Sequence, residues 1–191
     1  MKTKKQYTLS IFIVTILVFL DQITKYLAVI FLKDKPAIPI IKNVFELKYL
    51  ENTSAAFGMD PVSFLHNLFQ FEIFYKNPEL YLDVRMAFFY LLTIFMVLLL
   101  IWIFTRIPTN RRYVYIDIIM LLLIAGAIGN FIDRITQQYV VDFLYFKLIN
   151  FPIFNVADIY VTCAAFALFI FGIFYYKDED FDMIFPSKKE R

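Results

Sequence analysis

The chain alternates between long apolar runs and shorter polar segments, and four apolar runs are long enough to cross a bilayer. They cover about residues 9–32, 86–104, 113–135 and 159–176. A membrane-spanning helix needs roughly 20 consecutive, mainly apolar residues. The pattern therefore predicts an all-α integral membrane protein with four transmembrane helices, the whole chain (1–191) forming a single membrane domain.

The composition supports membrane insertion and excludes several other classes of protein. Hydrophobic residues make up 61% of the chain and charged residues 19%. The net charge of +2 is too small to indicate a nucleic-acid partner. The single cysteine, Cys163, excludes an internal disulfide and a cysteine-rich metal site. The basic start and first apolar run imitate a secretory signal, but no small-x-small cleavage site follows, so we expect a retained first span.

Positive charges between the apolar runs predict the orientation in the membrane. Arg106, Arg111 and Arg112 lie in the short segment between the second and third runs, which contains no acid. Short loops rich in Lys and Arg remain in the cytoplasm. An even number of spans then places both termini in the cytoplasm, and the segments 33–85 and 136–157 outside.

The outer segment 33–85 shows a strand pattern. In "NVFELKYLE", Phe45, Leu47 and Tyr49 alternate with Glu46 and Lys48, the period of a half-buried strand. With "IPII" before it and "SAAF" after it, this pattern predicts a small extracytoplasmic β-sheet in the first outer loop. The aromatic-rich stretch 61–77 fits a helix lying at the membrane interface.

Several polar residues interrupt the spans. Asp21 and Lys25 are four positions apart, on one face of the first helix. At the centre of a span each charge would cost about 2.5–3.5 kcal/mol, so the two form either a structural ion pair near the outer interface or part of a functional site. Asp133 is a third candidate carboxylate, but its neighbour Arg134 and its position at the helix end favour a structural pair with Arg134.

The polar residues gather at one face of the membrane, which predicts a site there. Asp142, in "YVVDFLYF", and Asp158, at the start of the fourth span, are its candidate carboxylates. Two carboxylates in a poorly hydrated site cannot both ionise cheaply, so they can supply a general base and a general acid without a metal or cofactor. In the other interpretation, Asn155 and Asp158 form a capping box at the start of a helix.

Other catalytic chemistries find less support. The only histidine, His66, is in an unrelated loop, and no zinc motif is present. A pair of Ser54 with Lys25 remains open as a nucleophile, although it matches no motif. Gly126 and Gly129, three positions apart, are expected to allow close helix packing.

Five short motifs occur in order over the four spans: "DQITK", "ENTSAAFG", "GAIGNFIDR", "VVDF" and "FNVAD". Together they resemble the lipoprotein signal peptidases of bacteria (signal peptidase II), from about Ile11 to Tyr176. The resemblance implies an aspartyl endopeptidase that removes the signal peptide of diacylglyceryl-modified prolipoproteins just before the lipidated cysteine. It implies Asp142 and Asp158 as the catalytic dyad. The residues that it implies as supporting or substrate-binding are Asp21, Lys25, Asn52, Gly126, Asn130, Arg134, Asn155 and Ala157.

The sequence departs from the family pattern at Ser54 and Ala125, where glycine is usual, and the segment 59–85 is longer than usual. The resemblance further implies an enzyme of the bacterial cytoplasmic membrane that works as a monomer among membrane lipids, with its active site on the outer face. The alternative function is an ion- or proton-coupled transporter using Asp21, Lys25, Asp142 and Asp158. A membrane scaffold would explain the apolar spans but not the gathered polar residues.

Overall fold

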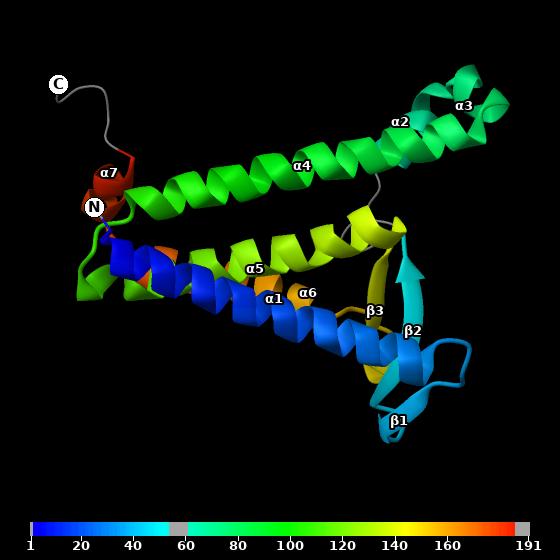
Figure 1. Cartoon of the computed structure of the whole chain (residues 1–191), viewed down its shortest axis with the longest axis horizontal. Coiled ribbons are helices and arrows are strands. Elements are labelled where there is room, and N and C mark those ends of the chain that lie inside the picture. The colour runs from blue at the N-terminus through cyan, green and yellow to red at the C-terminus, as the bar shows by residue number, and fades with distance from the viewer. Residues whose placement is uncertain (1, 54–60, 186–191) are drawn as a thin grey trace. The chain divides into compact units, whose positions relative to one another are not determined.

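The computed structural model describes residues 2–53 and 61–185, and within them four helices are long and apolar enough to cross a membrane (Figure 1). These are α1 (Lys4–Leu32), α4 (Pro78–Arg106), α5 (Val114–Gln137) and α6 (Val156–Phe174). The fold is mostly helical, as predicted. Shorter helices are α2 (Pro61–Phe69), α3 (Glu72–Lys76), α7 (Asp178–Ile184) and the 3-10 turns η2 (Arg111–Tyr113) and η3 (Lys147–Ile149).

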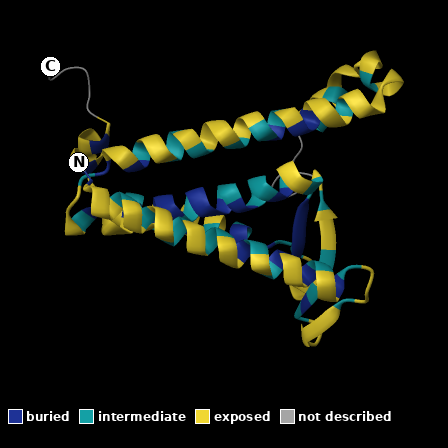
Figure 2. Cartoon of the chain, in the orientation of Figure 1, coloured by how far each residue is buried: buried dark blue, intermediate teal, exposed yellow. Residues whose placement is uncertain are grey.

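Large apolar side chains cover the outside of these helices. Figure 2 shows exposed residues along much of α1 and α4. Phe12, Phe19, Leu91 and Leu98 each leave more than 60% of their surface uncovered. A helix that is apolar around its circumference is typical of a membrane span. This apolar surface is therefore suited to contact with lipid.

The described chain forms two compact units. The helical unit contains the N-terminal part of the chain up to Thr24, Met96–Gly129, and the chain from Val156 onward. The sheet unit contains Lys25–Phe95 and Asn130–Asn155. Helices α1, α4 and α5 each contribute residues to both units.

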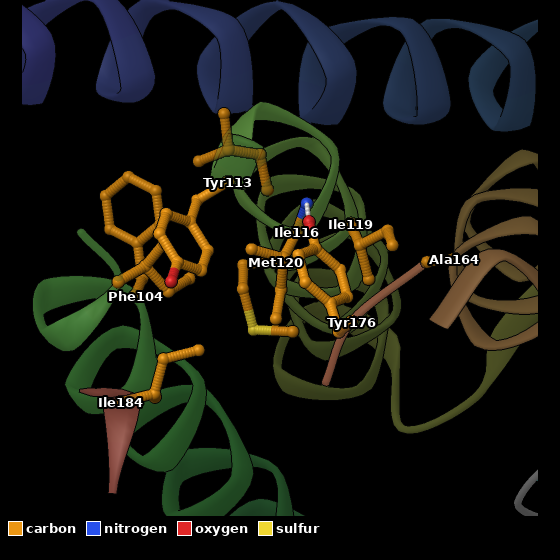
Figure 3. Packing of buried hydrophobic residues seen from close by; sticks show 10 residues of the cluster. Phe104, Tyr113, Ile116, Ile119, Met120, Ala164, Tyr176 and Ile184 are labelled. Atoms are coloured by element: carbon orange, nitrogen blue, oxygen red, sulfur yellow. Dashed lines mark hydrogen bonds between the residues drawn. The ribbon is translucent and has the colours of Figure 1, made fainter. Parts of the chain in front are cut away.

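The core of the helical unit lies where α4, α5, α6 and the C-terminal segment meet. Figure 3 shows Phe104, Tyr113, Met120, Ala164 and Tyr176 packed together there. The rings of Tyr113 and Tyr176 stack in parallel with their centroids 6.0 Å apart. Burial of such aromatic surface contributes to stability through its apolar area and its ring geometry.

Residues near both ends of the described chain contact the segment that joins α4 to α5 and the first turn of α5 (Figure 1). The ammonium of Lys2 lies 2.7 Å from the carboxylate of Asp117 and donates to the carbonyl of Ile107. At the other end of the chain, Arg112 donates from Nε and Nη2 to both oxygens of Asp180, at 2.8 and 2.6 Å. The hydroxyl of Tyr113 donates to the same carboxylate at 2.8 Å. The bidentate pair of Arg112 and Asp180 holds α7 against the rest of the helical unit.

Two glycines of α5 let α6 and α1 approach closely. A Cβ on Gly126 would lie 2.7 Å from the carbonyl oxygen of Ala157 and 2.7 Å from a methyl of Val161. A Cβ on Gly129 would lie 2.5 Å from the carboxylate of Asp21. The predicted role of these glycines in close helix packing is confirmed.

The sheet unit contains three antiparallel strands in the order β1 (Ile38–Ile41), β2 (Phe45–Asn52) and β3 (Val140–Tyr145). The strand predicted at 45–50 is present, but the third strand comes from 140–145, which was not expected to form one. The "SAAF" segment lies outside the described residues. Figure 2 shows β3 as mostly buried. Apart from Asp142, its side chains are apolar or aromatic on both faces and give no alternating pattern.

Two further differences from the predicted pattern concern single side chains. Glu46 is buried, although the alternation placed it outside, because its carboxylate accepts from Lys147 at 2.7 Å. The stretch predicted as one interfacial helix forms α2 and α3, with Gln70 between them at a positive φ of 48°. Phe64 and Phe69 on α2 remain exposed, and the location of these helices in the membrane interface stays a prediction.

Candidate functional site

Asp142, in the middle of β3, is fully buried and accepts two hydrogen bonds from asparagine side chains. Asn52 Nδ2 donates to Oδ2 at 2.7 Å, and Asn155 Nδ2 donates to Oδ1 at 2.7 Å. The register of β2 on β3 brings Asn52 alongside, since Asn52 pairs with Val140. Asn155 is held there because the preceding residue, Phe154, exchanges backbone hydrogen bonds with Leu144 of β3.

A second layer of polar side chains lies behind Asn155. The same Nδ2 of Asn155 lies 3.1 Å from Asn130 Oδ1, which also accepts from the ammonium of Lys25 at 2.8 Å. Lys25 in turn forms an ion pair with Asp133 at 3.0 Å, and Asp133 accepts from the backbone N–H of Val141 at 3.1 Å. Lys25 and Asp133 are both buried. The structure thus brings five predicted site residues of the sheet unit together: Lys25, Asn52, Asn130, Asp142 and Asn155.

Asp133 forms an ion pair that the sequence did not predict. Its partner Lys25 comes from a distant part of the chain, and the pairing of Asp133 with the adjacent Arg134 stays a prediction. Arg134 donates from Nη1 to the backbone carbonyl of Asn130 at 3.3 Å and lies over the ring of Phe89. Asp133 is therefore part of the buried polar network behind Asn155, through Lys25 and the backbone of Val141.

Asp158 belongs to the helical unit, in the first turn of α6. The backbone of this turn is fixed by Asp21, whose Oδ1 accepts from the N–H of Ala157 at 2.9 Å. Gln22, which the sequence did not single out, donates from Nε2 to Asp21 at 3.2 Å and to the carbonyl of Gly129 at 3.1 Å. Asp21 thus supports the turn that carries Asp158. The capping function suggested for Asp158 itself stays a prediction.

Lys33, Tyr49 and Glu51 form a charged rim at the end of β2, next to Asn52. The ammonium of Lys33 donates to Glu51 at 2.8 Å, and the hydroxyl of Tyr49 donates to the same carboxylate at 3.1 Å. The hydrogen bond from Lys33 lowers the pKa of Glu51, and burial raises the pKa of Tyr49. Glu51 therefore stays ionised on the exposed rim. Ser54, the alternative nucleophile, lies outside the described residues.

Comparison with known proteins gives consistent matches over most of the chain. The family described as signal peptidase (SPase) II matches residues 13–174. A lipoprotein signal peptidase of Caldanaerobacter subterraneus subsp. tengcongensis is 38% identical over 87% of this chain and 97% of its own length. The lipoprotein signal peptidase of Bacillus subtilis (strain 168) is 32% identical over 83% of this chain and 88% of its own.

Solved structures give the same result for the fold. A bacterial membrane enzyme determined by the in meso method is 27% identical, with a TM-score of 0.67, over 96% of this chain and 94% of its own. The matches cover both units of the described chain.

Proposed function

We propose that this chain, which belongs to the signal peptidase II family, cleaves its substrate with the carboxylates of Asp142 and Asp158. As a lipoprotein signal peptidase, it removes the signal peptides of prolipoproteins. The match to the family over residues 13–174 carries this function. The aspartyl mechanism is supported by the buried carboxylate of Asp142, which two asparagine amides hold in place.

The two carboxylates would share a single proton during the reaction. The ionised carboxylate takes a proton from water, whose oxygen attacks the carbonyl carbon of the scissile peptide bond. The protonated carboxyl then gives its proton to the departing nitrogen as the carbon–nitrogen bond breaks. The products are a signal peptide with a new carboxylate and a lipoprotein with a new amino terminus. Such acid–base assistance is worth about 10²–10⁴-fold for each group.

The family and the charges along the chain support a more specific proposal for the substrate and the location. We infer that the substrate cysteine already carries diacylglycerol and that cleavage occurs just before it. The enzyme is a multi-pass membrane protein. We further propose that it lies in the cytoplasmic membrane as a monomer surrounded by lipid, with both termini in the cytoplasm and the site at the outer face. The Arg106, Arg111 and Arg112 cluster supports this orientation.

The family assignment does not favour the transporter alternative. The test of the function is incubation of the purified protein with a diacylated prolipoprotein, followed by electrophoresis. We expect the substrate to lose the mass of its signal peptide, while the same prolipoprotein without diacylglycerol remains uncut. An unchanged diacylated substrate would contradict the function, and equal cleavage of both would contradict the requirement for the lipid.

A further inference from the structure

A chain of hydrogen bonds leads from the buried ammonium of Lys25 to the carboxylate of Asp142, and each donor in it is oriented by the one before. We propose that Lys25 keeps Asp142 ionised through two asparagines, so that Asp142 activates the water and Asp158 carries the proton. The inference rests on the proposed function, in which these two aspartates form the reacting pair. It assigns the base and the acid within that pair, and it makes Lys25 a positioning residue for the base.

The first link of this chain is the contact between Lys25 and Asn130. A lysine ammonium has three donors and no acceptor. The atom of Asn130 that lies 2.8 Å from it must therefore be the carbonyl oxygen. That oxygen also lies 3.1 Å from the side-chain amide of Asn155. Asn155 must turn its NH₂ group toward Asn130, because two carbonyl oxygens would repel each other.

The second link fixes the hydrogen bond to the carboxylate. The NH₂ group of Asn155 carries two hydrogens, and its nitrogen lies 2.7 Å from Asp142 Oδ1. A proton on Oδ1 would point at a donor. A proton on Oδ2 would require Asn52, which donates to that oxygen at 2.7 Å, to turn its own amide around. Hydrogen bonds donated to a carboxylate favour its ionised form.

Charged groups of the sheet unit near Asp142 include Lys25 on α1, residues of α5 and Glu51 on β2. On α5, Asp133 balances Lys25 at 3.0 Å, and the guanidinium of Arg134 lies over an aromatic ring. On β2, the backbone of Glu51 pairs with that of Val141, the neighbour of Asp142. The side chain of Glu51 is 40% exposed. Because Asp133 neutralises Lys25, the lysine acts on Asp142 through the direction of the hydrogen bonds more than through its charge.

The pH dependence of cleavage tests the assignment. The acidic limb of the pH profile reports ionisation of the base, and the basic limb reports loss of the proton from the acid. Lys25→Met removes the donor that orients Asn130. We expect its acidic limb to move upward by about one pH unit, the size that a hydrogen bond to a charged group supports. Lys25→Arg retains donors and charge and should return the limb toward its wild-type position.

Two results would overturn the assignment. A shift of the basic limb in Lys25→Met would make Asp142 the acid, and a uniform loss of activity with neither limb moved would reduce Lys25 to a structural residue. A wild-type protein that cuts no prolipoprotein would instead count against the proposed function. If Lys25→Met fails to fold, ¹³C NMR of labelled aspartates in the wild-type protein provides the second measurement.

That measurement reads the protonation state of each carboxyl directly, with resonances assigned by Asp142→Asn and Asp158→Asn. At neutral pH we expect the Asp142 carboxyl to be ionised and the Asp158 carboxyl to be protonated. The reverse pattern, or two ionised groups, would overturn the inference.

Discussion

The carboxylate of Asp21 accepts a hydrogen bond from the backbone N–H of Ala157, across 136 positions of the chain. Ala157 lies in the first turn of α6, where backbone N–H groups have no partner within the helix. A carboxylate at this end also complements the helix dipole. Asp21 of α1 therefore caps the N-terminus of α6, at the turn that carries Asp158.

Replacement of Asp21 should lower both stability and activity. Asp21→Ala leaves the Ala157 N–H without its acceptor, and we expect a loss of about 0.5–2 kcal/mol, as for other helix caps. Asp21→Asn keeps an acceptor oxygen but not the charge, so its loss should be smaller. Thermal unfolding in detergent and a cleavage assay measure the two effects. Equal stability of wild type and Asp21→Ala would show that the cap contributes nothing.

The two candidate catalytic aspartates should each be essential. We expect Asp142→Asn and Asp158→Asn each to lower cleavage by at least ~10²-fold with the fold retained, because asparagine cannot exchange the proton. The double variant should be little worse than either single one, since the pair acts as a unit. Asp34→Asn, at an exposed position, is the matched control, and chelators should have no effect.

The capping interpretation of Asp158 gives a different result in the same assay. Asparagine is itself a good N-cap. Near-normal cleavage by Asp158→Asn would therefore indicate that Asp158 caps the helix and does not take part in catalysis.

The glycines of α5 should tolerate no side chain. Gly126→Ala would force its methyl against the backbone carbonyl of Ala157 and a methyl of Val161. Overpacking of this kind costs about 1–3 kcal/mol. Adding Val161→Ala should recover only part of the loss, because the backbone contact remains.

Gly172, on α6, provides the control for helix propensity, because nothing lies within 4 Å of a Cβ placed there. Gly172→Ala should leave the unfolding temperature unchanged or raise it slightly. A loss equal to that of Gly126→Ala would show that close packing is not the cause.

The attachment of α7 should weaken in acid. The Arg112 guanidinium, followed by the N–H of Lys177, holds the pKa of the Asp180 carboxyl well below its usual range. A lowered folded-state pKa stabilises the protein at pH values above the unfolded value of about 4, and this contribution is lost as the pH falls toward the folded value. We expect Asp180→Asn to unfold at a lower temperature than wild type at pH 7.

Below about pH 4 the difference between wild type and Asp180→Asn should shrink. Asp178→Asn, at an exposed position of the same helix, is the control and should follow wild type throughout. A difference that is constant with pH would show that the effect of Asp180 does not depend on its charge.

The sequence predicted the helices better than it predicted the polar contacts. Long apolar runs identify α1, α4, α5 and α6 because a bilayer sets a minimum length for a span. Strand β3 was not predicted, since residues buried on both faces give no alternation. The seven residues of α7 are too few to show a helical period, and the helix depends on packing and on Asp180.

The sequence indicated which polar residues belong to the candidate site, but not which residues they contact. Asp142, Lys25 and Asn155 stood out as polar residues in apolar surroundings. Sequence spacing suggested local pairs and gave no sign that Lys25 also contacts Asp133 and Asn130. Contacts of this kind depend on how the helices pack, which spacing along one helix does not contain.

The distance along the chain between Lys25 and Asn130 also has a consequence for biosynthesis. The two residues are 105 positions apart, and a ribosome adds about 5–20 residues each second. Helix α1 therefore enters the membrane roughly 5–20 seconds before the acceptor of its lysine has been made. During that interval Lys25 must stay near the lipid headgroups or be shielded by the insertion machinery, so assembly of the site is delayed until α5 arrives.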